Sequence, residues 1–241
     1  MKKDEFITLL INKSKENNIY INNKQAEKMY EYKNILLEWN EKINLTAITD
    51  DEDIIVKHFV DSLLSVEHIV ENTKIIDVGT GAGFPGIIIA IYFDGKVNIT
   101  LLDSLQKRIN FLNEVIEKLK LKNIKAIHGR AEEFAHKEEF RECYDIAIAR
   151  AVAPLNILLE YLTGYIKVNG KCICMKSLSV DEEIKGAKKA YEMMNLNCVK
   201  NIKKTIKYNE EITRVILIFS KSKVLSNKYP RNYGKIKKSP L

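Results

Sequence analysis

Apolar and polar positions change their period once along the chain. Before residue 73, apolar side chains recur every three to four positions, which is the spacing of an amphipathic helix. From Lys74 onward, short apolar runs of strand length alternate with helical segments. The pattern predicts helices at residues 4–17, 24–41 and 52–70, then strands at 74–78, 97–103, 124–128, 144–149, 171–176, 197–202 and 213–220, alternating with helices at 85–92, 105–120, 131–140, 154–168 and 181–194.

Alternating strands and helices are typical of an α/β fold with an open, largely parallel sheet and helices on both faces. We predict three parts: a helical N-terminal extension (1–72) packed on the α/β domain, the α/β domain itself (73–220), and a basic C-terminal tail (221–241). Pro154 is suited to start a helix, and Gly170 stands where that helix would end.

A glycine-rich turn follows the first predicted strand. In the run Asp77-Val78-Gly79-Thr80-Gly81-Ala82-Gly83, three alternate positions lack a Cβ atom. The backbone can therefore turn sharply and let a ligand come within van der Waals distance. The apolar residues 84–93 then begin a helix whose N-terminal amides face that ligand.

An acid at the end of the second strand, Asp103, is placed to accept ribose hydroxyls. Gly81 to Gly86 satisfies the dinucleotide fingerprint GxGxxG, with Asp103 about 20 residues further on. S-adenosylmethionine is favoured over a dinucleotide, because Asp77 precedes the first glycine and Gly79 is the first residue past the strand. A structural turn without a ligand is the remaining alternative.

This turn and the seven predicted strands favour a class I (Rossmann-like) S-adenosylmethionine-dependent methyltransferase fold. Its seven-stranded sheet is mostly parallel, and its last strand usually runs antiparallel. We therefore expect the same arrangement here, with the helical N-terminal extension added to it.

Charge is distributed unevenly along the chain. The formal net charge of the 241 residues is +7. Beyond Glu211 there is no acidic residue and there are eight basic ones, so the preceding part is close to neutral. A neutral body with a basic tail indicates a polyanionic partner, with RNA the natural candidate. A tail that only improves solubility is the alternative.

Composition narrows the class of protein further. The longest apolar run is far shorter than the roughly 20 residues that cross a bilayer, and no secretory signal follows Met1, so we expect a cytoplasmic protein without membrane contact. The four cysteines and four histidines form no metal-ligand spacing, so we expect no metal.

Cys172 and Cys174 share one strand face, which predicts small buried residues. His58 and Asp61, one helical turn apart, predict a local hydrogen-bonded pair.

The candidate site lies at the carboxyl ends of the strands, where ligands of open α/β sheets gather. Ala131 and Glu132 follow the third strand and would carry the adenine of the cofactor, although Glu132 could instead stabilise the start of the next helix. Arg150 ends the fourth strand and could contact the cofactor carboxylate or an RNA phosphate. A structural ion pair with Asp145 or a nearby glutamate is its alternative.

Two motifs are missing at the end of the fourth strand: Asn/Asp-Pro-Pro-aromatic, associated with exocyclic amines, and the Pro-Cys nucleophile for cytosine C5. A ring nitrogen such as guanine N7 carries a free lone pair and no proton, so its methylation needs no general base. Alignment and desolvation should then dominate catalysis. A-form RNA hides N7 in a deep, narrow groove, so the guanine must be unpaired or extruded.

Several segments together resemble one known family along nearly the whole chain. They are Trp39-Asn40, residues 43–48, His58-x-x-Asp61-Ser62-Leu63, residues 77–86, Asp103-Ser104-Leu105-x-Lys107-Arg108, residues 129–133, residues 150–155 and Tyr229-Pro230-Arg231. They are similar to RsmG, also called glucose-inhibited division protein B, the bacterial 16S ribosomal RNA guanine-N7 methyltransferases. Asn232-Tyr233 and Ile236 depart from the usual wording of the family's tail.

The resemblance implies an enzyme that uses S-adenosylmethionine to methylate N7 of one guanine in 16S ribosomal RNA, near the decoding region. It implies cofactor binding by Gly79, Phe84, Ala131, Glu132 and Arg150. The residue pattern itself adds Gly81, Asp103 and Ser104. Lys176 resembles the basic residue that the family carries after the fifth strand, and with Arg150 it is a candidate for positioning the guanine or the RNA.

We expect 16S ribosomal RNA or the small ribosomal subunit as the partner. We also expect a monomer, since the pattern leaves no spare apolar helix. Two alternatives stay open at this point: an NAD-dependent oxidoreductase built on Gly81 to Gly86, and a catalytically silent ribosome-assembly factor that has kept the cofactor pocket.

Overall fold

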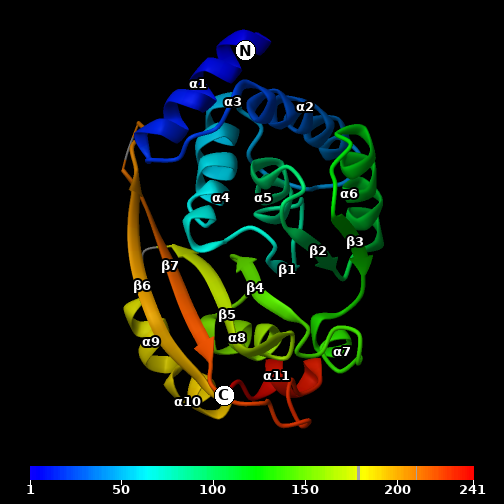
Figure 1. Cartoon of the computed structure of the whole chain (residues 1–241), viewed down its shortest axis with the longest axis vertical. Coiled ribbons are helices and arrows are strands. Elements are labelled where there is room, and N and C mark those ends of the chain that lie inside the picture. The colour runs from blue at the N-terminus through cyan, green and yellow to red at the C-terminus, as the bar shows by residue number, and fades with distance from the viewer. Residues whose placement is uncertain (178–179, 210) are drawn as a thin grey trace.

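The computed structural model describes residues 1–177, 180–209 and 211–241. Seven strands form one sheet in the order β3-β2-β1-β4-β5-β7-β6 (Figure 1). They are β1 (Lys74–Val78), β2 (Asn98–Asp103), β3 (Ile124–His128), β4 (Tyr144–Arg150), β5 (Ile166–Ser177), β6 (Leu196–Ile206) and β7 (Ile212–Lys221). β7 runs antiparallel to both its neighbours, and the other pairs are parallel. The predicted fold class is confirmed.

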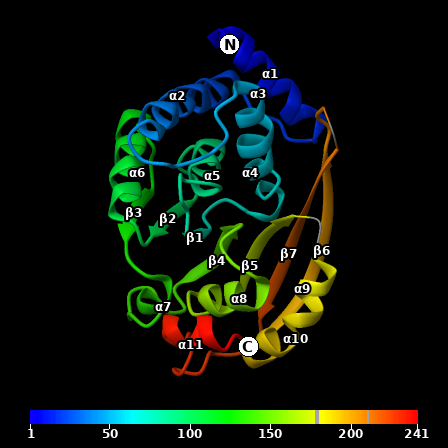
Figure 2. The same cartoon turned by 180° about the vertical axis from the view of Figure 1, so that it is seen from behind.

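Side chains along each strand alternate between two hydrophobic cores, one on each face of the sheet. Ile146 and Ile148 of β4 belong to the first core, and Ala147 and Ala149 to the second. The first core is covered by α1 (Lys3–Glu16), α2 (Asn23–Asn40), α5 (Gly86–Phe93) and α6 (Gln106–Lys118), and the second by α7 (Ala131–Phe134), α8 (Leu155–Thr163), α9 (Asp181–Gly186) and α10 (Lys188–Met193) (Figure 2).

Helix α2 contacts the glycine-rich turn directly. Tyr32 of α2 is fully buried, and its hydroxyl donates a hydrogen bond to the carbonyl of Ala82. The indole nitrogen of Trp39 donates to Glu114 of α6 at 3.0 Å. Residues of α1 and α2 therefore share a continuous core with the sheet and support the turn after β1.

The segment 52–70 is not the single α-helix that its apolar pattern predicts. It divides into α3 (Asp51–Asp53), a π-helix η1 (Ile54–Val60), α4 (Asp61–Leu63) and a short 3₁₀ turn η2 (Val66–His68). A π-helix places one more residue in each hydrogen-bonded turn than an α-helix does. The change of helix type cannot be seen in a pattern with one apolar residue every three or four positions.

Two further helices are much shorter than predicted, and a third is divided in two. α8 begins beside Pro154 as expected but ends at Thr163, and Gly170 lies inside β5 because that strand already starts at Ile166. α7 stops at Phe134, and the predicted helix 181–194 is divided at Ala187. The predicted burial of Cys172 and Cys174 on one strand face is confirmed, since both lie in the second core.

The last residues of the chain return to the body. β7 ends at Lys221, which is fully buried. The chain then continues to α11 (Tyr233–Lys238), which lies beside α7 and α8 in both views (Figures 1 and 2). Within the described residues, we find no helix with the length and apolar character needed to cross a membrane.

Candidate functional site

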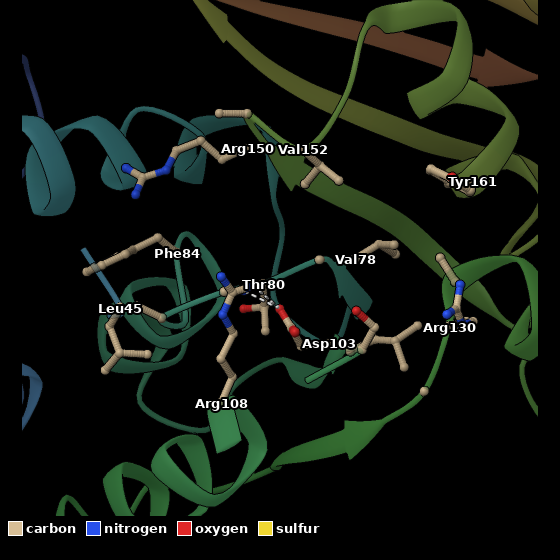
Figure 3. A pocket seen from close by; sticks show the side chains of 18 of the residues that line it. Leu45, Val78, Thr80, Phe84, Asp103, Arg108, Arg130, Arg150, Val152 and Tyr161 are labelled. Carbon is tan, nitrogen blue, oxygen red and sulfur yellow. Dashed lines mark hydrogen bonds and ion pairs between the residues drawn. The ribbon is translucent and has the colours of Figure 1, made fainter. Parts of the chain in front are cut away.

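A cavity of about 480 Å³ opens at the carboxyl ends of β1, β2, β3 and β4 (Figure 3). All the residues predicted to bind a cofactor line this cavity: Gly79, Gly81, Phe84, Asp103, Ser104, Ala131, Glu132 and Arg150. Lys176 does not line it. Figure 3 places Arg150 and Phe84 toward one end of the cavity and Arg130 and Tyr161 toward the other, with Val152 between them. We call this the first cavity.

A buried carboxylate, that of Asp77, stabilises the turn after β1. Asp77 accepts hydrogen bonds from the Thr80 hydroxyl at 2.7 Å and from the Gly86 backbone amide at 2.9 Å. Burial raises the pKa of Asp77 to about 6, against the opposing effect of these two hydrogen bonds. Gly79, at the start of the turn, adopts a φ of +70°, in the left-handed region that favours glycine. Asp77 therefore shapes the turn, while Gly79 lines the cavity.

Asp103 joins the glycine turn to the end of β2. One carboxylate oxygen accepts from the Gly81 amide at 2.9 Å and from Arg108 at 3.2 Å, and the other accepts from the Leu105 amide at 3.0 Å. Each carboxylate oxygen can accept more than one hydrogen bond, so Asp103 can hold the turn and still meet a polar ligand. Glu132 is also buried, in the first turn of α7, and lies 3.8 Å from Arg130.

Arg150 is fixed by the π-helix and α4 rather than by its own strand. One guanidinium nitrogen donates to Asp61 at 3.0 Å, and the other lies 3.2 Å from Nδ1 of His58. Asp145, the partner predicted as an alternative, instead pairs with Lys167. Burial lowers the pKa of Arg150, while Asp61 raises it. The structural ion pair thus exists, but its carboxylate comes from a segment 89 residues earlier in the chain.

His58 is held on both sides. Its Nε2 lies 2.8 Å from the Thr46 hydroxyl, and its ring stacks on Phe84 with the centroids 4.5 Å apart. Because an arginine can only donate, Nδ1 accepts from Arg150 and Nε2 carries the proton. Burial, followed by the positive charge of Arg150, lowers the pKa of His58 to about 3. The predicted hydrogen bond between His58 and Asp61 is replaced by a shared partner, Arg150.

This environment predicts a pH-dependent contribution to stability. Neutral His58 stabilises the fold above its unfolded pKa of about 6.5, and this contribution is lost as the pH falls from there toward 3. We expect the contribution of His58 to the free energy of unfolding to be about 2 kcal/mol smaller at pH 5 than at pH 7. Asp77 acts in the opposite direction, since its pKa is raised to about 6.

Asp77 is present in both the wild type and His58→Gln, so its effect cancels when the stabilities of the two proteins are compared at each pH. Urea unfolding at pH 7 and pH 5 should show the stability advantage of the wild type shrinking by about 2 kcal/mol at the lower pH. Titration followed by NMR should show His58 neutral at pH 5. An equal advantage at both pH values, or a midpoint near 6.5, would contradict the assignment.

A second cavity of about 500 Å³ adjoins the first. The two cavities share His58, Arg150, Ala151 and Val152 as common lining residues. The second cavity extends from this shared wall toward β5 and β7, where its further charged lining residues are Lys57, Asp61, Lys176, Glu183 and Arg214. Four of its side chains are cationic and two are carboxylates, so its lining has a formal charge of +2 and is suited to an anionic or electron-rich ligand.

Lys176 and Arg214 are brought to the second cavity by strand pairing. Lys176 donates to the carbonyl of Ala153 at 2.7 Å and pairs with Glu183 at 2.7 Å. Arg214 of β7 stands opposite Ser177 of β5, and its Nε donates to Asp61 at 3.1 Å. Asp61 therefore holds Arg150 and Arg214 together. In the sequence, Arg214 was only one of eight cations near the C-terminus, and no local pattern marked it.

Two tyrosines that sequence reasoning missed line the first cavity near Ala131. Tyr161 comes from α8 and Tyr233 from α11. Burial raises the pKa of Tyr161 to about 12, with a smaller contribution from Glu132. The sequence offered no motif for either, although Tyr233 stood out as a departure from the wording of the family's tail.

Comparison with protein families gives one match that covers most of the chain. Residues 25–213 match the model of the family described as rRNA small subunit methyltransferase G. The chain is 46% identical to ribosomal RNA small subunit methyltransferase G from Alkaliphilus metalliredigens, over 92% of this chain and 93% of the relative. It is also 46% identical to the protein of that name from Clostridium botulinum strain Loch Maree, over 98% of this chain and 99% of the relative.

Solved structures share the fold at low sequence identity. The ribosomal protein L11 methylase from Lactobacillus delbrueckii subsp. bulgaricus has a TM-score of 0.52 and 15% identity, over 69% of this chain and 79% of its own. M. jannaschii TYW2 in complex with AdoMet has a TM-score of 0.50 and 19% identity, over 63% of this chain and 70% of its own.

Proposed function

The chain belongs to the rRNA small subunit methyltransferase G family, and we propose that it transfers a methyl group from S-adenosylmethionine to N7 of a guanine in 16S ribosomal RNA. The observation that carries this proposal is the pair of adjoining cavities with Arg150 in their shared wall. One cavity has the features of a nucleoside cofactor site, and the other is lined by cations. Family membership decides against the nicotinamide-dependent alternative.

The residues along the first cavity match the successive chemical groups of S-adenosylmethionine. The turn at Gly79 lets the ligand approach the backbone closely, and Asp103 offers carboxylate oxygens to ribose hydroxyls. Ala131 and Glu132 lie where the adenine would sit, after β3. In this placement Arg150 would hold the carboxylate of the aminobutyrate end, and the methyl group on the sulfonium would lie near the shared wall.

The second cavity would receive the guanine. Its two carboxylates are already engaged: Asp61 binds Arg150 and Arg214, and Glu183 binds Lys176. Methylation of N7 needs neither as a general base. The N7 lone pair forms the new bond to the methyl carbon, the carbon–sulfur bond breaks with its electrons moving to sulfur, and the positive charge passes to the guanine ring. The protein contributes alignment and exclusion of water.

The acceptor must leave its helix to reach this cavity, since N7 is inaccessible in the deep groove of A-form RNA. Lys57, the most exposed cation of the second cavity, can help to neutralise the phosphates that flank an extruded guanine. The exposed lysines after β7, such as Lys228 and Lys235, add positive charge to the molecule outside the cavity. We therefore propose that the cations of the second cavity and the exposed lysines after β7 bind an RNA strand.

Nucleoside mass spectrometry tests the proposal. Small subunits that lack the modification, and deproteinised 16S RNA, are incubated with the protein and methyl-labelled S-adenosylmethionine. We expect labelled 7-methylguanosine at one site. Label on another atom would contradict the N7 assignment, and cofactor binding without any incorporation would favour the silent assembly factor over the enzyme.

A further inference from the structure

The residues that follow β7 are anchored to the body by polar contacts to their backbone. The guanidinium of Arg141 donates to the carbonyls of Leu225 at 3.0 Å and Tyr229 at 3.0 Å. The buried carboxylate of Glu160 accepts from the Arg231 side chain at 2.8 and 2.7 Å and from its backbone amide at 2.8 Å. Residues 222–232 are therefore held in place immediately before α11.

α11 begins at the rim of the first cavity. The Asn232 side chain caps the helix by accepting from the Lys235 amide at 2.9 Å. Its first residue, Tyr233, lines the first cavity together with Tyr161 and Arg130, and the Arg130 guanidinium lies 5.3 Å from the centre of the Tyr233 ring. Tyr233 is nevertheless 44% exposed, so part of the ring has no protein contact.

We propose that Tyr233 is a cofactor-binding residue that covers the adenine of S-adenosylmethionine, so that the C-terminal segment closes one end of the first cavity. The inference rests on the proposed function. Tyr233 lines the same cavity as Ala131 and Glu132, which are expected to meet the base, and its ring lies near Arg130, the residue that precedes Ala131. A flat purine can cover exposed area of the ring by stacking.

The alternative occupant of the Tyr233 ring is a base of the RNA. The cavity lining favours the cofactor, because Tyr233 belongs to the lining of the first cavity and not to that of the second. The contact would make the end of this chain part of the cofactor site, although the sequence indicates only a basic tail there. The inference concerns cofactor affinity, which can be measured without RNA.

Calorimetry on point variants of the full chain tests the inference. We expect Tyr233→Ala to weaken S-adenosylmethionine binding about tenfold, a change of about 1.4 kcal/mol, because a stacked base is lost. Tyr233→Phe should stay within about twofold, since stacking needs the ring and not the hydroxyl. The matched control is Tyr20→Ala, which removes an exposed tyrosine between α1 and α2, and it should leave the affinity unchanged.

A second ligand locates the contact along the cofactor. 5′-Methylthioadenosine keeps the adenine and ribose but lacks the aminobutyrate end, so Tyr233→Ala should weaken it by the same factor. In addition, S-adenosylmethionine should slow trypsin cleavage at the exposed Lys235 and Lys237 in the wild type but not in Tyr233→Ala.

Unchanged affinity for both ligands, or a loss seen only with S-adenosylmethionine, would overturn the inference. A loss confined to RNA binding would also overturn it and would assign the ring to the substrate. If the unaltered protein bound no S-adenosylmethionine, the proposed function itself would fail. Methyl transfer to an atom other than N7 would refute that function while leaving the adenine contact standing.

Discussion

Replacement of Asp61 by asparagine is expected to lower the free energy of unfolding by at least about 3 kcal/mol and the melting temperature by roughly 6–12 °C. The Asp61 side chain is only 5% exposed and pairs with both Arg150 and Arg214. Asparagine keeps the shape of the side chain but removes its charge. Two guanidinium groups then lie close together without the carboxylate that compensates for their burial.

The same substitution should reduce methyl transfer by about 100-fold in kcat/KM, because both arginines line the second cavity and would move apart. Affinity for S-adenosylmethionine should fall by a smaller factor because, of these two arginines, Arg150 lines the first cavity as well and Arg214 does not. Thermal unfolding, calorimetry and methyl-transfer kinetics on one preparation separate these effects.

Asp94→Asn is the matched control for Asp61→Asn. Asp94 also pairs with two cations, Lys24 and Lys28, but its side chain is 50% exposed. Exposed pairs are worth less than about 1 kcal/mol, so this variant should unfold close to the wild-type temperature. If the two variants had the same melting temperature, Asp61 would not stabilise the fold by compensating the charges of Arg150 and Arg214.

Replacement of Gly79 by aspartate is expected to weaken S-adenosylmethionine binding by more than about 100-fold while the protein remains folded. The φ of +70° at this position costs an ordinary residue about 1–2 kcal/mol. An added Cβ would stand 3.0 and 3.1 Å from two methyl carbons of Val152, which also lines the first cavity. The carboxylate would then occupy the space where the cofactor approaches the turn.

Gly95→Asp separates backbone strain from the loss of the binding site. Gly95 also has a positive φ, +88°, and an added Cβ there meets Lys122 at 3.1 Å, but it lies between α5 and β2, outside the cavity lining. Both variants should lose similar stability in thermal unfolding, and only Gly79→Asp should lose cofactor affinity by calorimetry. Unchanged affinity of Gly79→Asp would remove the cofactor from this turn.

Hydrophobic periodicity and the positions of the glycines predict much of the fold, because both reflect local structure. Strand positions, the sheet type and the burial of Cys172 and Cys174 follow from alternating side chains and short connections. Ends of elements were less predictable. α8 stops at Thr163 because β5 starts early and pairs with β4, and that pairing joins Ile166 to Tyr144, which lies before the helix.

The sequence by itself determined which groups stand at the ends of the parallel strands, since those ends must meet at one edge of the sheet. Gly79, Asp103 and Arg150 therefore line one cavity, as their positions predict. Only the tertiary structure decided their partners. Asp61, Arg214 and Tyr233 reach the two cavities from α4, the antiparallel strand β7 and the C-terminal helix α11, because packing of distant segments sets these contacts.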